Sequence, residues 1–176
     1  MNISIEKFTA GDIPSLLSWI TSKEFLQQWC GKTFEYPLTE SQLVKYIKWT
    51  ETIPVLRHVY KAVDEDTTEH IGNITLEFST RIENAAALTC IIVGNEKYRG
   101  RGIGNMMIQF ALNKAFVDFN FDNVYLNVYS FNKHAIKCYK KAGFSRVSEN
   151  ISEYSGKKAV NYLMMISKSD WKKSPA

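Results

Sequence analysis

Apolar positions along the chain switch between the two-residue period of a strand and the wider period of a helix, a pattern typical of α/β proteins. Two strand-like runs, 58–63 and 70–78, are separated by the acidic turn Asp64-Glu65-Asp66, which predicts a hairpin. The run from Ala86 to Val93 is apolar on both faces, as expected of a central strand. The runs predicted to be strands are 3–8, 58–63, 70–78, 86–93, 124–129, 144–147 and 160–166.

Helical periodicity follows Asp12, Thr39, Gly102 and Asn132. Thr39 is expected to cap its helix, with Gln42 completing a capping box, and Gly143 is expected to end the helix that Asn132 caps. The side chains expected on the buried faces of the first three helices are Ile13, Leu16, Leu17, Ile20, Leu43, Tyr46, Ile47, Thr50, Ile103, Met106, Met107, Phe110 and Val117. The pattern predicts a mixed α/β (α+β) protein with about seven strands and about four helices.

The composition fits one domain, because 176 residues with 45% hydrophobic side chains can bury a sizeable core. We expect residues 1–170 to form this domain and residues 171–176 a short polar tail. The apolar run from Ala85 to Val93 is too short to cross a membrane, and the first residues lack the apolar stretch of a signal peptide. Three cysteines without a Cys-x-x-Cys pair favour reduced thiols and offer no zinc ligand set. A cytoplasmic protein without a metal site is therefore expected.

The charge balance is mildly basic, with a net charge of +4 and an isoelectric point near 8.9. The basic residues are dispersed, however, and the densest group is Lys168, Lys172 and Lys173. A solvated surface explains this distribution better than a nucleic-acid interface, although positive charge would help to collect an anionic ligand. We expect neither a nucleic-acid nor a membrane partner, and the sequence leaves monomer and homodimer open.

A glycine-rich turn, Tyr98-Arg99-Gly100-Arg101-Gly102-Ile103-Gly104-Asn105, links the central strand to the third helix. Glycines let amide groups converge on an anion, and the helix adds its unpaired N-terminal N–H groups and its dipole. A Walker loop is excluded, because Asn105 and Met106 stand where Lys and Ser or Thr are needed. A dinucleotide fingerprint is excluded, because neither glycine register ends in Gly or Ala. The turn predicts another phosphate-bearing cofactor.

Two motifs resemble those of the GNAT N-acetyltransferases. Arg99-x-x-Gly102-x-Gly104 is similar to the superfamily's acyl-coenzyme A motif, Gln/Arg-x-x-Gly-x-Gly/Ala, and the segment from Asn127 to Phe144 resembles its Asn-x4-Asn-x2-Ala-x3-Tyr-x3-Gly-Phe pattern. The resemblance implies the GNAT fold, a splayed, mixed, mostly antiparallel sheet whose parallel pair, 86–93 and 124–129, opens to admit the pantetheine arm. The N-terminal half of the chain resembles the branch that contains the ribosomal-protein N-terminal acetyltransferases (RimJ/RimL-like). The matching residues are Trp29, Gly31, Phe34 and Pro37-Leu38-Thr39.

The resemblance also implies a site for acetyl-CoA. Arg99 and Arg101 bring positive charge to the turn, and an N–H group near Val93 is expected to polarise the thioester carbonyl. Ile91, Ile92 and Val93 are expected to pair with the pantetheine amides as an added strand would. The backbone N–H groups expected to hold the pyrophosphate are those of Arg101, Gly102, Ile103, Gly104 and Asn105.

Asn132, Ala135 and Tyr139 have the spacing that places them on one helix face. The resemblance makes Tyr139 the general acid that protonates the coenzyme A thiolate. It also assigns Asn127 and Asn132 to the cofactor, with room left by Ala135. Without the motif, Tyr139 would be a core aromatic residue and Asn132 only an N-cap. Direct attack by the amine in a ternary complex is expected, because Cys138 points about 100° away from Tyr139 and lacks a partnered histidine.

The general base departs from the GNAT pattern, because many relatives carry a glutamate early in the central strand, where this chain has Ala86-Ala87-Leu88-Thr89. Glu77 is the best substitute, since the alternation of 73–78 places its carboxylate on one face of a neighbouring strand. A solvent-facing strand glutamate is an equally good interpretation. A missing base favours an acceptor amine of low pKa or a proton relayed by water.

The amine acceptor is expected to bind between Trp19 and Pro54, where aromatic residues can wall a cleft: Trp29, Phe34, Tyr36, Tyr46 and Trp49. A peptide N-terminus, a polyamine, an aminoglycoside and an amino sugar all remain open. The leading hypothesis is an acetyl-CoA-dependent N-acetyltransferase. A non-catalytic acyl-CoA sensor is the alternative suggested by the missing glutamate, and a nucleic-acid module is suggested by the isoelectric point alone.

Overall fold

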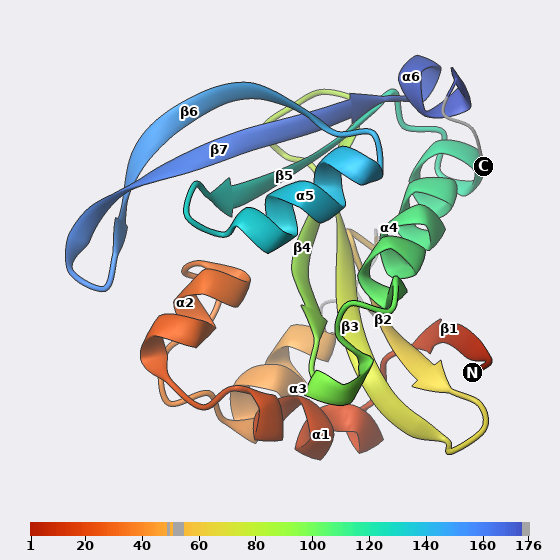
Figure 1. Ribbon diagram of the computed structural model, residues 1–176, viewed down its shortest axis with the longest axis vertical. Coiled ribbons are helices and arrows are strands. Elements are labelled where there is room, and N and C mark those ends of the chain that lie inside the picture. Colours follow the sequence, from red (N-terminus) through yellow and green to blue (C-terminus); the bar gives the residue numbers. More distant parts are fainter. Residues whose placement is uncertain (49, 51–54, 174–176) are drawn as a thin grey trace.

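One seven-stranded sheet organises this computed structural model, which describes residues 1–48, 50 and 55–173. Within these residues every neighbouring pair of strands is antiparallel except β4 and β5. The predicted mixed, mostly antiparallel sheet is therefore confirmed (Figure 1). In the spatial order β1-β2-β3-β4-β5-β7-β6, the strands are β1 (Ile3–Lys7), β2 (Arg57–Asp64), β3 (Glu69–Phe78), β4 (Ala85–Val93), β5 (Asn123–Tyr129), β7 (Lys157–Ser167) and β6 (Ser145–Tyr154).

The four expected helices are present, and the described residues contain two more. The α-helices are α1 (Ile13–Trp19), α2 (Lys23–Cys30), α3 (Glu40–Lys48), α4 (Ile103–Asn113), α5 (Lys133–Lys141) and α6 (Lys168–Lys173). Helix α2 was not predicted. Its N-cap is Ser22, a residue type that favours this position, and the Ser22 hydroxyl accepts a hydrogen bond from the Phe25 N–H at 3.1 Å. Helix α6 reaches into the expected tail, and its Trp171 ring packs 5.3 Å from that of Phe116. No helix in the described ranges is long and apolar enough to span a membrane.

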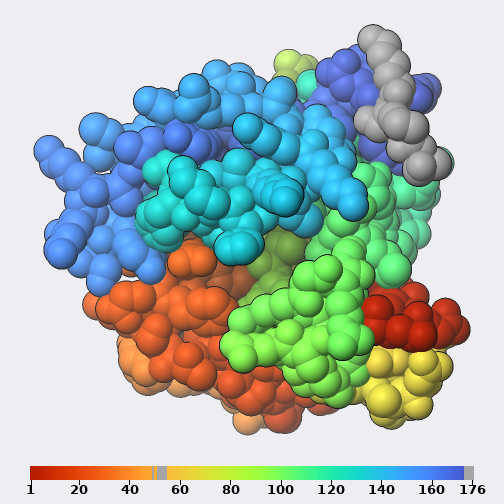
Figure 2. Space-filling model, viewed as in Figure 1, coloured from red at the N-terminus to blue at the C-terminus, as the bar shows by residue number. Residues whose placement is uncertain are grey.

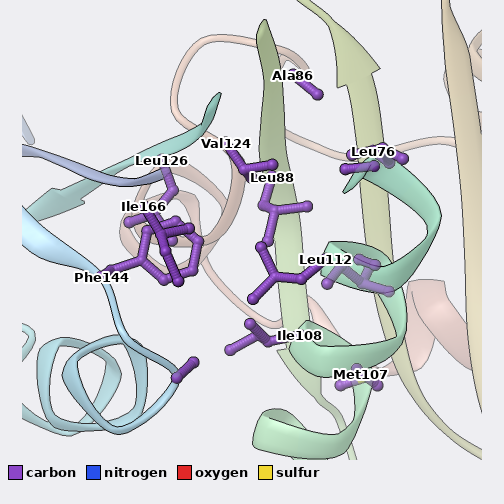
Figure 3. Packing of buried hydrophobic residues seen from close by; sticks show 14 of the residues in the cluster. Leu76, Ala86, Leu88, Met107, Ile108, Leu112, Val124, Leu126, Phe144 and Ile166 are labelled. Carbon is purple, nitrogen blue, oxygen red and sulfur yellow. The ribbon is translucent and has the colours of Figure 1, made fainter. Parts of the chain in front are cut away.

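The sheet buries a separate hydrophobic cluster on each face. Sheet residues such as Leu76 and Leu88 pack against Ile108 and Leu112 of α4, and Phe144 and Ile166 extend this cluster toward α5 and β7 (Figure 3). On the other face, α1, α2 and α3 cover the sheet with the side chains Ile13, Leu16, Leu26, Leu43 and Tyr46. Because both faces are covered, the central strand β4 is apolar on both sides, as its sequence predicts.

The predicted inner face of α4 is wrong at two positions. Met106 and Val117 are 44% and 59% exposed, whereas Met107 and Phe116 are fully buried. Adjacent helical residues point about 100° apart, so only one of two neighbouring methionines can face the sheet. Past Asn113 the helix widens into a π-helical turn, Lys114–Asp118, in which the Phe119 N–H donates to the Lys114 carbonyl at 3.0 Å. The wider turn changes the helical phase, and Val117 faces outward.

Two further local predictions need correction. The Gln42 N–H donates to the Thr39 hydroxyl at 3.4 Å, but the Gln42 side chain bonds Glu35 and Pro37 in the preceding loop, so only half of the capping box forms. Strands β6 and β7 form a much longer hairpin than the runs 144–147 and 160–166 predicted. Most of β6 is exposed, so its sequence carries no alternation of apolar and polar positions.

Candidate active site

A cleft opens where the parallel strands β4 and β5 separate. The two strands pair at only three positions, Ala85 with Asn123, Ala86 with Val124 and Ala87 with Tyr125. Beyond these pairs β4 and β5 no longer bond to each other, and β4 stays paired with β3 while β5 stays paired with β7. The resulting cleft has a volume of about 1430 Å³, and a hollow between α2, α5 and the start of α4 is visible in Figure 2. This exceeds the roughly 300–1,000 Å³ of most ligand pockets, so it has room for a cofactor and a second substrate.

A bulge shapes the β4 wall of this cleft. The register against β3 moves from Asn73–Ile92 to Thr75–Thr89, which leaves Cys90 and Ile91 opposite a single residue. Cys90 has a φ of 50°, in the left-handed region that few side chains adopt. A bulge takes backbone groups out of the ladder and redirects them. It lies directly before Ile92 and Val93, in the stretch predicted to pair with pantetheine, and Ile91, Ile92 and Val93 all line the cleft.

The glycine turn forms the predicted start of α4. Gly100 and Gly102 have φ values of 76° and 86°, which explains why glycine is needed at both positions. Gly102 is the N-cap of α4, and no side chain of the described residues caps the helix there. The first N–H groups of an 11-residue helix, those of Ile103, Gly104 and Asn105, therefore border the cleft together with Gly102. This is the geometry of an anion site at a helix N-terminus.

The two arginines of the turn differ. The Arg99 guanidinium donates to the Val93 and Gly94 carbonyls, each at 3.1 Å, and to Glu96 at 3.0 Å. Arg99 lines the cleft and fastens the turn to the end of β4. The exposed Arg101 is absent from the described residues that line the cleft, so it contributes charge beside the site rather than a wall.

Helix α5 closes the opposite side of the cleft. The Asn132 Oδ1 accepts from the Ala135 N–H at 3.2 Å, so Asn132 is an N-cap. Asn132, Ala135 and Tyr139 all line the cleft, as their shared helix face predicts. Asn127, on β5, lines it too, but strand alternation turns its side chain to the face that Tyr125 and Tyr129 occupy.

The environment of Tyr139 keeps its phenol protonated. Burial is the main cause that raises the pKa of Tyr139 above its ordinary value, and the neighbouring Cys138 adds to the effect. The Tyr139 ring also packs edge-on against Phe144, with 6.3 Å between centroids. A phenol that stays protonated at neutral pH has a proton to give to a strongly basic leaving group such as a thiolate.

Glu77 lies in a row of residues that crosses four strands. Arg57, Glu77, Ala87 and Tyr125 are directly opposite one another on β2, β3, β4 and β5, so their side chains leave the same face. Ala87 belongs to the stretch where many GNAT relatives carry glutamate, and Glu77 is its neighbour one strand away. Arg57 Nε donates to Glu77 Oε1 at 2.7 Å, and the Tyr46 hydroxyl donates to the same oxygen at 3.4 Å. Glu77 lines the cleft in this paired state.

Helix α2 forms a further wall of the cleft and is tied to the β6–β7 hairpin. The Gln27 amide donates to the Glu153 carbonyl at 2.7 Å and accepts from the Ser155 N–H at 3.0 Å. The Ser155 hydroxyl also donates to Glu24 at 3.1 Å. These bonds join segments more than a hundred residues apart, which sequence patterns do not reveal.

The aromatic residues predicted to wall the acceptor cleft have different positions. Trp29 lines the cleft and stacks on Phe34, with 6.0 Å between ring centroids. Phe34 and Tyr46 pack 4.9 Å apart and border a smaller neighbouring pocket instead. Tyr36 is 48% exposed, and Trp49 lies outside the described residues.

Four side chains that line the cleft hold a buried polar atom without a hydrogen-bond partner among the described residues: Trp29 Nε1, Thr89 Oγ1, Asn105 Oδ1 and Asn161 Oδ1. Buried polar atoms are rarely left unpaired in folded proteins, so at these positions a ligand or a water molecule would complete the bonding. Asn161, on β7, and Tyr125 were not predicted as site residues. No motif surrounds either of them, and only the pairing of β5 with its neighbours brings them to the cleft.

A comparison with protein families identifies the family of this chain. The family model described as an acetyltransferase (GNAT) domain matches residues 2–145. The chain belongs to this GNAT family. GNAT domains use acetyl-CoA, so the expected family and cofactor are confirmed, and the expected class of enzyme, an N-acetyltransferase, is supported.

Solved structures share the GNAT fold of this chain at low identity. A spermidine N-acetyltransferase SpeG chimera from Vibrio cholerae and hSSAT has a TM-score of 0.81 and 19% identity, covering 99% of this chain and 100% of that one. The Vibrio cholerae spermidine N-acetyltransferase in complex with CoA and spermine has a TM-score of 0.81 and 19% identity. The match covers 97% of this chain and 98% of that one. These likenesses show the fold alone. They involve spermidine acetyltransferases, so the ribosomal-protein branch remains a prediction.

A curated relative matches a shorter segment. The "Probable N-acetyltransferase san" of Drosophila melanogaster is 42% identical over 57 residues, which are 32% of this chain. The match spans only 31% of that protein's own length. It therefore supports the acetyltransferase family without assigning an acceptor.

Proposed function

We propose that this GNAT chain transfers the acetyl group of acetyl-CoA to a primary amine by direct attack in a ternary complex. The observation that carries the proposal is a single cleft lined both by the N-terminus of α4 and by the Tyr139 phenol. The N-terminus of α4 would supply an anion site for the cofactor's phosphates, and the Tyr139 phenol on the α5 wall would supply a proton.

Binding of acetyl-CoA would rest mainly on backbone groups. The N–H groups of Gly102, Ile103, Gly104 and Asn105 border the cleft where the pyrophosphate would lie, and Arg101 adds positive charge beside them. The backbone of Ile91, Ile92 and Val93 follows the β4 bulge and would pair with the pantetheine amides. Asn127 and Asn132 line the same cleft as further cofactor contacts, and the small Ala135 leaves space for the pantetheine arm.

In the proposed reaction the amine nitrogen attacks the thioester carbon, and a backbone N–H near Val93 stabilises the charge that forms on the carbonyl oxygen. The C–S bond then breaks, and Tyr139 gives its proton to the departing thiolate. The ammonium proton leaves to water or to Glu77. Because Arg57 and Tyr46 already occupy Glu77 Oε1, Glu77 would act through its second oxygen or through a water molecule.

An acceptor with a low amine pKa suits this arrangement. An α-amino group, with a pKa near 8, is partly unprotonated at neutral pH, whereas a lysine-like amine near 10.4 depends on a strong base. A peptide N-terminus is therefore the acceptor that we favour over a polyamine, an aminoglycoside or an amino sugar. This choice agrees with the sequence resemblance to the ribosomal-protein N-terminal acetyltransferases.

Two measurements test the proposal. Calorimetric titration should give binding of both acetyl-CoA and free CoA. Initial rates at varied concentrations of both substrates should then give intersecting double-reciprocal lines, as a ternary complex requires. Parallel lines would instead indicate an acyl-enzyme, and loss of turnover in Cys138→Ala would identify Cys138 as its carrier.

The alternative is a non-catalytic acyl-CoA sensor. The observation that favours it is Ala87 in the glutamate stretch, with the nearest carboxylate already paired to Arg57. A sensor should bind acetyl-CoA tightly and transfer no acetyl group to any amine in a broad panel. Transfer to any member of that panel would exclude it.

A further inference from the structure

The charged side chains that line the cleft are almost all basic. Among the described residues Glu77 is the single carboxylate in the lining, and its charge is offset by Arg57 at 2.7 Å. The lining lysines and arginines are Lys32, Arg81, Arg99, Lys137 and Lys141. The interior of the cleft therefore has no net negative charge with which to bind a cation.

These cations divide between two ends of the cleft. Arg99 belongs to the glycine turn, and Lys137 and Lys141 belong to α5, which places them with the phosphate site. Lys32 follows α2, and the adjacent Thr33 borders a small pocket together with Arg57, the ion-pair partner of Glu77 near the end of β3. Arg81 follows β3. Strand β3 ends where Phe78 pairs with Ala86 at the start of β4, whereas the glycine turn follows the far end of β4. Arg81 therefore lies at the end of the cleft away from the phosphate site.

The charged groups of Lys32 and Arg81 are not engaged in ion pairs within the described part of the chain. Both residues are exposed. A third donor lies on the same side, since Trp29 precedes Lys32 by one turn and its Nε1 is buried without a partner in the described part of the chain. An indole N–H is only a donor, so the group that completes its bonding must be a hydrogen-bond acceptor.

We propose that the amine acceptor of this enzyme carries a carboxylate in addition to its reactive amine, and that Lys32 and Arg81 bind this carboxylate. The inference rests on the proposed acetyl transfer and narrows its substrate class. A polyamine such as the spermine bound by the Vibrio cholerae structure would bring additional positive charge to a cleft end that is already positive. An acidic N-terminal peptide and a free acidic amino acid share the required chemistry.

The test uses acceptors that differ only in charge. Three tetrapeptide amides, with Glu-Glu, Gln-Gln or Lys-Lys after an N-terminal serine, present the same α-amine. Free glutamate and glutamine form a second pair that distinguishes a small acceptor from a peptide, and spermidine is the polycation. We expect kcat/KM to fall by about tenfold from the acidic to the neutral peptide and further to the basic peptide, with the difference reduced at high salt. Preference for spermidine or for the lysine peptide would overturn the inference and leave the acetyl transfer itself intact.

Charge reversal then identifies the residues. The double variant Lys32→Glu/Arg81→Glu should reverse the order of the three peptides, while Lys48→Glu, on exposed α3 surface away from the cleft, should keep it. An unchanged order in the double variant would overturn the role of Lys32 and Arg81. Calorimetry of the same peptides with the CoA-bound protein gives the charge preference without turnover. Binding of the acidic peptide without acetyl transfer would therefore count against the proposed acetyltransferase activity and support the proposed preference for a carboxylate. If no acidic probe binds, the proposed preference is overturned.

Discussion

The two ends of the cleft are built in different ways. At the proposed phosphate end, the backbone N–H groups beside the cleft belong to one continuous segment, Gly102 to Asn105, and the turn that leads into it has two glycines with positive φ. At the proposed acceptor end, the walls are side chains such as Trp29, Glu77 and Tyr125 that come from α2, β3 and β5. An anion site made of backbone groups depends on the conformation of one short segment, so it can be recognised in the sequence as a motif. A site made of side chains from distant segments depends on their packing and leaves no such pattern.

The difference also extends to how each end is held. The glycine turn is fixed by the bonds of Arg99 to the carbonyls at the end of β4, only a few residues away. The acceptor wall is fixed by bonds between Gln27 and the tip of the β6–β7 hairpin, at Glu153 and Ser155. We therefore expect changes at the phosphate end to alter cofactor affinity, and changes at the acceptor end to alter the kinetic constants of the amine.

The largest effect is expected at Gly102. A carboxylate in Gly102→Glu would bring negative charge to the anion site, and we expect the Kd for acetyl-CoA to rise by at least about a hundredfold, or ~2.7 kcal/mol. Gly102→Ala is the matched control, because it introduces the same strain at a φ of 86° without the charge. Calorimetry measures both, with circular dichroism to verify folding. Equal affinities of the two variants would mean that no phosphate lies at this helix end.

The next effect concerns Tyr139, on the α5 wall of the cleft. Tyr139→Phe should lower kcat by roughly 10²-fold, as loss of a general acid does, while the acetyl-CoA Kd changes by less than about twofold. Tyr162→Phe removes a hydroxyl from β7 outside the cleft lining and should leave both constants unchanged. If Tyr139→Phe keeps the wild-type kcat, the phenol is a packing residue.

The pH dependence sharpens the same point. Burial raises the pKa of Tyr139, so the group keeps its proton to a higher pH than an ordinary tyrosine, whose pKa is about 10. The acidic form needed for catalysis should persist across the neutral and mildly alkaline range. We expect kcat to show no decline between about pH 7 and 9.5. An alkaline decline within this range that is absent from Tyr139→Phe would show that the phenol loses its proton too early to fit this environment.

A smaller effect is expected at Glu77. Glu77→Gln should lower kcat by about tenfold if the carboxylate accepts the amine proton. Glu149→Gln is a matched control, since Glu149 is also paired with an arginine, Arg146 at 3.1 Å, but lies outside the cleft lining. A kcat within about twofold of wild type in Glu77→Gln would assign proton removal to water.

The smallest effect tests the acceptor wall. Gln27→Ala removes two bonds to the β6–β7 hairpin, each worth about 0.5–1.5 kcal/mol, and loosens α2 beside Trp29. We expect the KM for the amine to rise by about three- to tenfold with the acetyl-CoA Kd unchanged. Gln109→Ala, which removes a bond from Trp171 at 3.3 Å, is the control and should alter neither constant. A parallel change in cofactor affinity in Gln27→Ala would mean that the two ends of the cleft are not independent.

Sequence patterns predicted the strands, the glycine turn and α5, because each depends on residues close in the chain. The predictions failed where tertiary context decided the outcome. Val117 is exposed because a π-helical turn changes the phase of its helix, and Gln42 bonds the loop before it rather than completing a capping box. The exposed strand β6 lacked the alternation that only a half-buried strand carries.

The sequence by itself predicted the GNAT family and its cofactor, and it placed the glycine turn at the start of a helix. These follow from motifs in which glycine, an anion-binding helix start and a helix face of Asn132, Ala135 and Tyr139 are encoded locally. Only the tertiary structure decided how β4 and β5 part after three pairs, where Glu77 lies relative to Ala87, and that Lys32 and Arg81 line the same cleft. The physical reason is that strand register and the burial of both sheet faces bring these distant side chains together, and no single segment carries that information.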